Sequence, residues 1–447
     1  MASTVADLIV ATLRASGVQP VYGTRRWSEL MGTVDEVLAG YDSLQAGQEA
    51  FYKDLHQHPE LSHQEHRTAQ QVAGKLREYG FTVAERIGGT GVVGTLANGR
   101  GPAVLVRCEL DALPVKEDTG AAYASTVTTQ DADGHLVPVD HACGHDLHMS
   151  CLLGLAKLLA GQPGQWSGTL LALFQPGEET GDGAQAMVDD GLAKRIPAPD
   201  VALAQHLLPG IAGTVATCPG PFMTAEDSIK VTVYGKGGHG AMPQHTIDPV
   251  VLAAMIVVRL QTVVSRVVAP ADTAVLTVGS IQAGTVSNLI PDHATLQLNL
   301  RSYAEPVRRR MLDAVRRIVR AECEASGSPR EPDFGTLASF PVMTNDPATT
   351  DRVAAAFGGQ FGDNALPIEP QTVSEDFPNI PNALGIPYTY WSIGFTDRKV
   401  YRAAEKEGKL QDLPTNHSPK FLPPMQPCLR TGTEALVSAA LAWLARH

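Results

Sequence analysis

Short apolar runs separated by helical stretches constrain the fold of this chain more than any other feature. Residues 103–110 (AVLVRCEL), 169–175 (TLLALFQ) and 201–207 (VALAQHL) are largely apolar, and 148–161 (HMSCLLGLAKLLAG) reads as a helix between the first two. Such strands are typical of a sheet that is buried on both faces, and strands that alternate with helices usually pair in parallel. We therefore predict an α/β unit with a mixed, largely parallel sheet and helices on both faces.

A second unit is indicated where the apolar pattern begins to alternate. Residues 227–235 (DSIKVTVYG) alternate with a period of two, which is typical of a strand with one face in water. An apolar helix over 248–266, two strands over 273–282 and 294–303, and a basic amphipathic helix over 305–326 follow. With a last strand near 332–342, the order is β-α-β-β-α-β. We expect a small α+β domain inserted into the larger one.

The chain has 447 residues, more than one ordinary hydrophobic core organises. The change of pattern divides it into an N-terminal appendage over 1–45, a main domain in two parts over 46–223 and 337–447, and the inserted domain over 224–336. The main domain is expected to resume after the insert and to end in a helix over 429–447.

The charge balance restricts the partners that the chain can have. Lys plus Arg number 35 and Asp plus Glu 47, a net charge of −12, which argues against nucleic acid and anionic membranes. We find no apolar run of about 18 residues and expect no transmembrane helix. The N-terminus lacks a basic segment and Asp7 interrupts its apolar stretch, so we expect no signal peptide. Six scattered cysteines suit the reducing cytoplasm.

Residues 141–149 (HACGHDLHM) place three histidines, a cysteine and an aspartate within nine positions. Further polar residues stand at the ends of the predicted strands, where ligands bind in open α/β sheets. Glu109 and Asp111 follow the first strand, and Glu178 and Glu179 follow the second. The candidate metal ligands at this edge, with one more from a late loop, are Cys143, His145, Glu179, His206 and His417.

Thiolate, imidazole and carboxylate ligands suit Zn²⁺ or Mn²⁺. Five ligands exceed one tetrahedral site, so two divalent ions are the more natural number. Glu178 would then be the general base that takes a proton from metal-bound water, whose pKa a metal lowers to about 7. None of these residues is specific alone. A single loop histidine is more often a satisfied polar residue, and a single cysteine a small buried apolar one.

Seven motifs together resemble a known family. They occur in the order ELDALPV, HACGHDLHM, FQPGEETGDGA, GKGGHGAMP, NLIPD, SEDF and NHSPKF, and span about 50–447. They resemble the amidohydrolase branch of the aminoacylase and carboxypeptidase metallopeptidases, which includes hippurate hydrolases and plant indoleacetyl-amino-acid hydrolases. The resemblance implies a catalytic domain with two metal ions, the five ligands named above, Glu178 as general base, and an inserted lid domain that also dimerises.

The resemblance also implies roles for residues outside the ligand set. Asp111 matches an aspartate that orients a metal ligand. His239 matches a lid histidine that reaches a catalytic site, that of the neighbouring subunit. Asn288 and Arg301 match lid residues that hold the free carboxylate of the substrate, which arginine can pair with two hydrogen bonds. The family usually has aspartate at the position of Glu109, so we assign Glu109 no metal role.

We therefore predict a metal-dependent hydrolase that cleaves the linear amide bond of N-acyl amino acids, forms a homodimer through its lid and works in the cytoplasm. A dipeptidase or carboxypeptidase of the same family is one alternative. An amidase with Cys143 as nucleophile and His145 as its base is another, and it would survive chelation. A metal-bound ligand-binding protein without turnover is the third, but binding alone needs no base such as Glu178.

Overall fold

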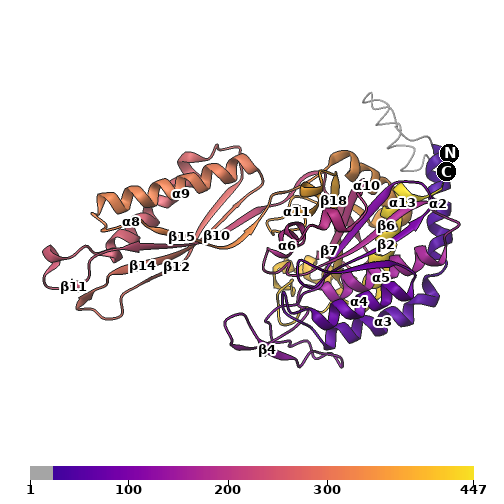
Figure 1. Ribbon diagram of the computed structural model, residues 1–447, viewed down its shortest axis with the longest axis horizontal. Helices are drawn as coiled ribbons and strands as arrows, with labels where there is room; N and C mark the ends of the chain where they lie inside the picture. The colour runs from indigo at the N-terminus through magenta and orange to yellow at the C-terminus, as the bar shows by residue number, and fades with distance from the viewer. Residues whose placement is uncertain (1–23, 447) are drawn as a thin grey trace.

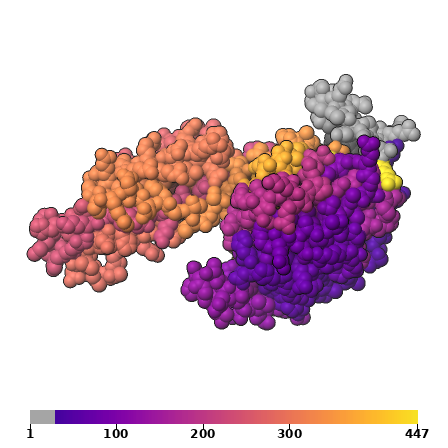
Figure 2. Space-filling model, in the orientation of Figure 1, coloured from indigo at the N-terminus to yellow at the C-terminus, as the bar shows by residue number. Residues whose placement is uncertain are grey.

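A computed structural model describes residues 24–446 and forms two units (Figures 1 and 2). The first and last described helices, α2 and α13, both lie in the larger unit. The smaller unit projects from the larger one as an arm, and Figure 2 shows that the two share only a narrow region of contact in this view.

An eight-stranded sheet in the order β1-β2-β6-β3-β7-β18-β8-β17 forms the centre of the larger unit. Its central strands β6, β3, β7 and β18 run parallel to one another. At one edge, β2 is antiparallel to both of its neighbours, β1 and β6. The predicted mixed, largely parallel sheet is thus confirmed. The strands are β1 (Thr82–Ile87), β2 (Gly91–Asn98), β3 (Ala103–Glu109), β6 (Gly168–Gln175), β7 (Val201–Ile211), β8 (Val215–Thr217), β17 (Ala365–Pro367) and β18 (Tyr388–Thr396).

Helices cover both faces of this sheet, as predicted. On β3, Val104 and Val106 enter one apolar core and Leu105 enters another on the opposite face. The first core is closed by α2, α3, α4, α5, α10 and α13, and the second by α6, α7 and α11. The helices are α2 (Thr24–Leu38), α3 (Tyr41–Gln57), α4 (His66–Glu78), α5 (His145–Gly161), α6 (Gly183–Asp189), α7 (Leu192–Arg195), α10 (Pro347–Phe361), α11 (Asn379–Leu384), α12 (Arg398–Glu407) and α13 (Met425–Leu444).

The expected appendage over 1–45 overlaps the core of the larger unit. Leu30 and Val34 of α2 and Tyr41 and Leu44 of α3 are buried in the first core. An apolar face on α2 explains this packing, since an amphipathic helix buries its apolar side against the rest of the fold. Residues 1–23 of the expected appendage lie outside the described residues. We propose that the main domain begins by residue 24.

The smaller unit, which we call the lid, has a four-stranded sheet in the order β12-β14-β10-β15. All its strand pairs are antiparallel, and two helices pack on one face. Side chains of β10 alternate between buried and partly exposed, which matches the period of two in its sequence. The elements are β10 (Ala225–Tyr234), β11 (Gly238–His239), α8 (Pro249–Thr262), β12 (Ala274–Ala283), β13 (Leu289–Ile290), β14 (His293–Ser302), α9 (Glu305–Ala325) and β15 (Asp333–Phe340).

Two connections join the lid to the larger unit. β9 (Gly220–Met223) leads into the lid and β16 (Met343–Asn345) leads out of it, and the two pair in antiparallel. β15 continues to Phe340, beyond the residue 336 at which we expected the lid to end. We propose a lid over 224–340. Elsewhere, β4 (Thr128–Gln130) and β5 (Leu136–Pro138) form a hairpin on the larger unit.

One segment of the lid has the length and apolar composition of a membrane-spanning helix, although we expected no such segment. Pro249–Val267, which is α8 and the π-helical turn η2 (Val263–Val267), is long and apolar enough to cross a membrane by length and composition. Its Leu252, Ile256 and Leu260 are nevertheless buried in the lid core. The same pattern is produced by a helix that packs one apolar face on a sheet, and here that packing is present.

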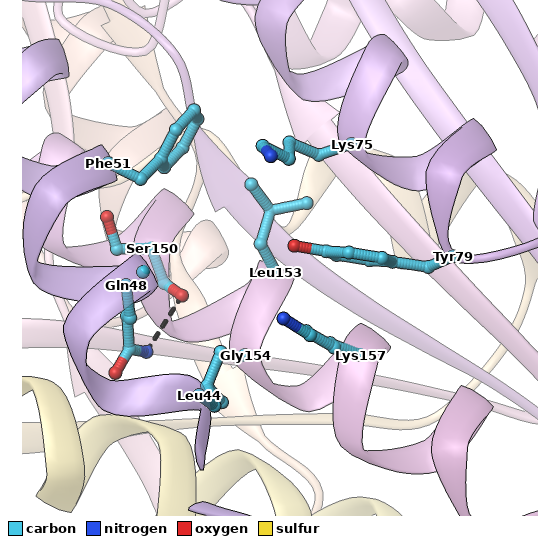
Figure 3. A pocket seen from close by; sticks show the side chains of 10 residues that line it. Leu44, Gln48, Phe51, Lys75, Tyr79, Ser150, Leu153, Gly154 and Lys157 are labelled. Carbon is cyan, nitrogen blue, oxygen red and sulfur yellow. Dashed lines mark hydrogen bonds between the residues drawn. The ribbon is translucent and has the colours of Figure 1, made fainter. Parts of the chain in front are cut away.

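A small cavity of about 70 Å³ lies where α3 and α4 pack on the outer side of α5 (Figure 3). Beside the cavity, Nε2 of Gln48 in α3 donates a hydrogen bond of 3.0 Å to the backbone oxygen of Ser150. Phe51, Tyr79 and Leu153 are among the residues that line it. None of the predicted site residues lines this cavity, so the candidate site lies elsewhere.

Candidate active site

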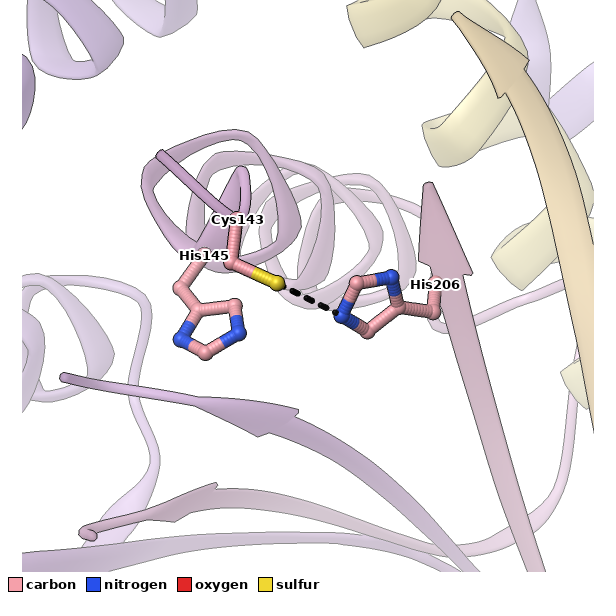
Figure 4. Close-up of side chains that lie close together, drawn as sticks. All are labelled: Cys143, His145 and His206. Atoms are coloured by element: carbon pink, nitrogen blue, oxygen red, sulfur yellow. Dashed lines mark hydrogen bonds between the residues drawn. The ribbon is translucent and has the colours of Figure 1, made fainter. Parts of the chain in front are cut away.

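The five predicted ligands come together from distant parts of the chain. Their donor atoms form two groups, Cys143 with His145 and His206, and Cys143 with Glu179 and His417, and within each group all atoms lie within 4.8 Å of one another. Cys143 Sγ lies 3.5 Å from His206 Nε2, as Figure 4 shows, and His417 Nε2 lies 3.4 Å from Glu179 Oε2. Two overlapping groups that share one thiol suit two neighbouring ions.

A glycine makes the turn that presents Cys143 and His145. Gly144 has a φ of +86°, the left-handed region that side chains other than glycine rarely adopt. A Cβ at this position would also lie 2.6 Å from Leu207 Cδ1 of β7. Two features therefore favour glycine at position 144, namely the backbone angle and the close packing against Leu207. The turn places Cys143 before α5 and makes His145 the first residue of that helix.

His417 is held by its backbone in a conformation that is uncommon for a residue with a side chain. Its φ is +68°, and its backbone N donates a hydrogen bond of 2.8 Å to the oxygen of Ala142. The preceding Asn416 donates from Nδ2 to the oxygen of Leu207 at 3.1 Å. These bonds fix the late loop to both sides of the site.

The two buried imidazoles present the same ring nitrogen to the site. His145 Nδ1 donates to the backbone oxygen of Asp111 at 2.8 Å, and His206 Nδ1 donates to that of Leu207 at 2.7 Å. In each ring Nε2 is then the atom with a free lone pair. His145 Nε2 and Glu179 Oε1 are buried without a hydrogen-bond partner among the described residues. Buried polar atoms are seldom left unpaired, so these donors fit a metal ion.

Asp111 connects the ligands to one another. Its Oδ2 accepts hydrogen bonds from Ser62 Oγ at 2.7 Å and from the backbone N of Glu179 at 3.0 Å. Its Oδ1 lies 3.4 Å from His145 Nδ1, and its side chain is fully buried. Asp111 thus holds the imidazole of His145 through its backbone oxygen and the loop of Glu179 through its carboxylate.

Glu178 lies outside the two groups that share Cys143, but its carboxylate lies within 4.8 Å of donor atoms of His145 and Glu179. Its Oε2 is 3.8 Å from His145 Nε2, the same distance as Oε1 of Glu179, and only 6% of the residue is exposed. Burial, and then the nearby carboxylates of Glu375 and Glu179, raise the pKa of Glu178 well above its ordinary value. Glu178 and Glu179 therefore face the same buried space from adjacent positions.

Burial and the nearby carboxylates of Glu179 and Glu178 also raise the pKa of the Cys143 thiol well above its ordinary value. A nucleophilic cysteine requires the opposite shift. In addition, the imidazole nearest to its sulfur is that of His206, not that of His145. The alternative of a Cys143 nucleophile activated by His145 is therefore disfavoured.

Sequence reasoning missed a buried charge cluster beneath the ligands. Arg107 of β3 pairs with Glu109 and, at 2.7 Å, with Glu375, and it also contacts Asp376 at 3.3 Å. All four residues are at most 2% exposed. The signal was an arginine inside an apolar strand, because a buried guanidinium requires acidic partners. Two of those partners, Glu375 and Asp376, belong to the SEDF motif.

Glu109, for which we predict no metal role, accepts a hydrogen bond from a histidine in addition to its ion pair with Arg107. Its Oε2 accepts a hydrogen bond of 2.7 Å from His148 Nδ1, and His148 Nε2 accepts one of 3.0 Å from the backbone N of Leu207. Both nitrogens of His148 are therefore engaged. These contacts join β3, α5 and β7 directly behind His145 and His206.

The lid residues do not gather at this site within one chain. His239 is exposed in β11, and Asn288 accepts a hydrogen bond from Gly240 N at 2.9 Å, so these two lie together at the end of the lid farthest from the larger unit (Figure 1). Arg301 lies at the other end of β14, where it pairs with Glu226 at 2.7 Å. The expected neighbourhood of Asn288 and Arg301 is not formed within one chain.

Comparisons with known proteins identify the family of this chain. Residues 105–415 match the model of peptidase family M20/M25/M40. The chain is 34% identical to thermostable carboxypeptidase 1 of Saccharolobus solfataricus, over 83% of this chain and 88% of that one, and 34% identical to hippurate hydrolase of Campylobacter jejuni, over 78% and 87%. A dinuclear metal-binding peptidase of family M20 from Bacillus subtilis superposes with a TM-score of 0.70 and 25% identity, over 90% and 98% of the two chains.

Proposed function

Because this chain belongs to peptidase family M20/M25/M40, we propose that it hydrolyses the amide bond of N-acyl amino acids with two bound divalent metal ions. The observation that carries the proposal is the pair of overlapping donor groups that share Cys143, with Glu178 buried beside them. Among its relatives, hippurate hydrolase is named for an N-acyl amino acid. The name of the Saccharolobus solfataricus relative favours a carboxypeptidase as the second candidate.

We propose that Cys143, His145 and His206 hold one ion and that Cys143, Glu179 and His417 hold the other. Sulfur, nitrogen and oxygen donors in this mixture suit Zn²⁺ or Mn²⁺. When bound, the ions would polarise the scissile carbonyl and make a water molecule more acidic. Asp111 would orient His145 and the Glu179 loop through the hydrogen bonds described above.

Glu178 is the proposed general base. Its carboxylate faces the same space as Glu179 but is not needed to complete either donor group. It would accept a proton from the attacking water and return that proton to the leaving amine. His239, from a second subunit, would donate a hydrogen bond to the oxyanion of the tetrahedral intermediate. In comparable sites one such donor lowers the activation free energy by about 3 kcal/mol.

Arg301 of one subunit and Asn288 of a second subunit are proposed to hold the free carboxylate of the substrate, because Asn288 lies with His239 at the other end of the lid. The guanidinium of Arg301 already donates to Glu226, to the backbone oxygen of Thr372 and to Ser374 Oγ. A substrate carboxylate would therefore compete with Glu226 for this guanidinium. Thr372 and Ser374 directly precede the acidic pair of the SEDF motif, so Arg301 lies close to its own catalytic unit.

A homodimer formed through the lid is the proposed assembly. Val251, Met255 and Val258 of α8 are about half to two-thirds exposed, and Val275 and Ile281 of β12 are about half exposed. β12 is also an edge strand of the lid sheet. An apolar face beside an open edge suits pairing with a second copy. All six cysteines are free, which suits the cytoplasm as the proposed location.

Replacement of each of the two adjacent glutamates by glutamine, one at a time, tests the proposed function. Glu178→Gln keeps the size of the side chain but removes the base, so kcat should fall by about 10² or more while the metal content stays at that of the wild type. Glu179→Gln is the matched variant and should lose metal. We would measure metal by inductively coupled plasma mass spectrometry and hydrolysis with acetyl, benzoyl, indoleacetyl and long-chain acyl amino acids.

Two results would contradict the proposal. Loss of metal in Glu178→Gln but not in Glu179→Gln would mean that the two roles are reversed. Full activity after exhaustive chelation would exclude the metal mechanism altogether.

A further inference from the structure

A second cluster of buried ionisable side chains lies outside the proposed ligand set. It comprises His56 near the end of α3, Glu117 in the loop after β3, Asp140 before the site segment, and Asp146 in the first turn of α5. His56, Asp140 and Asp146 are at most 1% exposed, and the side chain of Glu117 is fully buried. None of these residues has a role in the mechanism above.

The cluster is arranged around the imidazole of His56. Nδ1 lies 2.7 Å from Asp146 Oδ2, while Nε2 lies 3.3 Å from Glu117 Oε1 and 3.9 Å from Asp140 Oδ1. The donor atoms of His56, Glu117 and Asp140 all lie within 4.8 Å of one another. Donors that bind one tetrahedral ion at 2.0–2.2 Å are about 3.3–3.6 Å apart, so these separations are close to those of a coordination shell.

The charges of the cluster do not balance. Three carboxylates face the imidazole of His56, with the buried imidazole of His141 near Asp146, and no lysine or arginine of residues 24–446 forms an ion pair with Glu117, Asp140 or Asp146. Glu117 at least accepts hydrogen bonds from Thr119 Oγ1 and from the backbone N of Ser125. A buried carboxylate is costly unless a donor or a positive charge compensates it.

Asp140 lacks even such hydrogen bonds. Both of its carboxylate oxygens are buried without a hydrogen-bond partner in the part of the chain that the structure describes. Its Oδ1 is directed toward the ring nitrogen of His56 that Asp146 leaves free. An oxygen of Asp140 therefore lies near the ring nitrogen of His56 and the carboxylate of Glu117, where a shared positively charged ligand would compensate it.

We propose that His56 Nε2, Glu117 and Asp140 bind a third divalent cation of the Zn²⁺ or Mn²⁺ class, and that Asp146 orients the imidazole through its Nδ1–H. A carboxylate that holds the far nitrogen of a metal-binding histidine is a recurrent arrangement in metal sites. The ion is structural. It connects α3, the loop after β3 and the segment before α5, and Asp146, which orients His56, is adjacent to His145.

A bound proton is the competing explanation for the same geometry. Burial, and then the nearby carboxylate of Glu117, raise the pKa of Asp140 to about 7. The hydrogen bonds to Asp146 and Glu117 raise the pKa of His56 to about 10, against the effect of its burial. A protonated Asp140 or an imidazolium would need no metal, so the number of bound ions distinguishes the two explanations.

The first test counts metal ions in the full-length enzyme. Protein stripped with a chelator is saturated with Zn²⁺ or with Mn²⁺, desalted and analysed by inductively coupled plasma mass spectrometry. We expect three ions per chain in the wild type and two in Asp140→Asn. Asp133→Asn is the matched control, because Asp133 is exposed on the neighbouring hairpin, and it should keep three.

The proposal would be overturned if the wild type and Asp140→Asn bound equal numbers of ions both after saturation with Zn²⁺ and after saturation with Mn²⁺. The difference between the two proteins isolates this site, because a failure of the two proposed catalytic ions to bind would lower every count equally. A second measurement needs no variant. Crystals of the wild type soaked in MnCl₂ should give an anomalous difference peak between His56 Nε2, Glu117 and Asp140, and the absence of that peak would equally refute the third cation.

Discussion

Replacement of Arg107 by methionine should destabilise the larger unit, because its guanidinium is the positive charge that three buried carboxylates share. Arg107 Nη2 and Nη1 donate to the two oxygens of Glu375 at 2.7 and 3.0 Å, and Nε donates to Gln175 Oε1 at 2.8 Å. It also pairs with Glu109 and Asp376. Methionine keeps the apolar stem of the side chain, so that the change is mainly one of charge.

The magnitude follows from what the acids retain. Glu375 would still accept a hydrogen bond from Tyr390 Oη at 2.7 Å, and Asp376 would still accept one from Gln175 Nε2 at 2.6 Å. Their hydrogen bonds are thus partly kept, but their charges lose compensation in the buried interior. Removal of one partner of a buried ion pair costs about 3–5 kcal/mol. We expect a loss in the free energy of unfolding within this range.

Urea unfolding, followed by the fluorescence of the buried Trp166 and Trp391 of the larger unit, would measure this loss. Arg77→Met is the matched control, since Arg77 pairs with Glu85 at the surface and its side chain is 52% exposed. Its cost should be at most about 1 kcal/mol. Arg107→Met combined with Glu375→Gln should recover part of the stability, because one uncompensated charge is removed. A cost for Arg107→Met no larger than that of the control would refute this reasoning.

Two further predictions concern the lid. If Arg301 pairs with the substrate carboxylate, Arg301→Ala should reduce the preference for an N-acyl amino acid over its amide by about tenfold or more, since a hydrogen bond to a charged group contributes about 1.5–3 kcal/mol. The exposed Arg309 gives the control variant Arg309→Ala, and an unchanged preference in Arg301→Ala would remove Arg301 from the site. If His239 acts across the dimer, inactive His239→Ala and Glu178→Ala should recover roughly a quarter of wild-type activity when refolded together, because about half of the dimers are mixed and each has one intact site. No recovery in mixed dimers confirmed by tags would place His239 outside the partner's site.

The parts of the fold that the sequence could predict are those that local periodicity determines. β3, β6 and the start of β7 lie where the apolar runs are, and the lid has the predicted order of strands and helices. The five candidate ligands meet because the carboxyl ends of parallel strands lie at one edge of a sheet. Four of them could be placed there from the sequence, since Cys143, His145, Glu179 and His206 lie close to a predicted strand end or helix start, whereas His417 lies in a late loop.

Contacts between distant segments could not be predicted in the same way. Arg107 meets Glu375 across 268 positions, and no periodicity links a strand residue to a late loop. Likewise, β7 continues to Ile211, past the point where its apolar run ends, because pairing with β18 extends it. The start of α2 was also assigned to an appendage, since a single amphipathic helix does not reveal which surface it covers.

The two ends of the lid explain why one chain is insufficient for the proposed mechanism. Arg301 donates to Thr372 and Ser374 of its own larger unit, so the part of the lid that carries Arg301 is adjacent to its own site. His239 stands at the opposite end, exposed, in a two-residue strand paired with β13. A rigid sheet cannot bring both ends to the same place. A site that uses both residues therefore requires Arg301 from one subunit and His239 from the other, and the exposed apolar side chains of α8 and β12 are the surface through which a second copy could supply it.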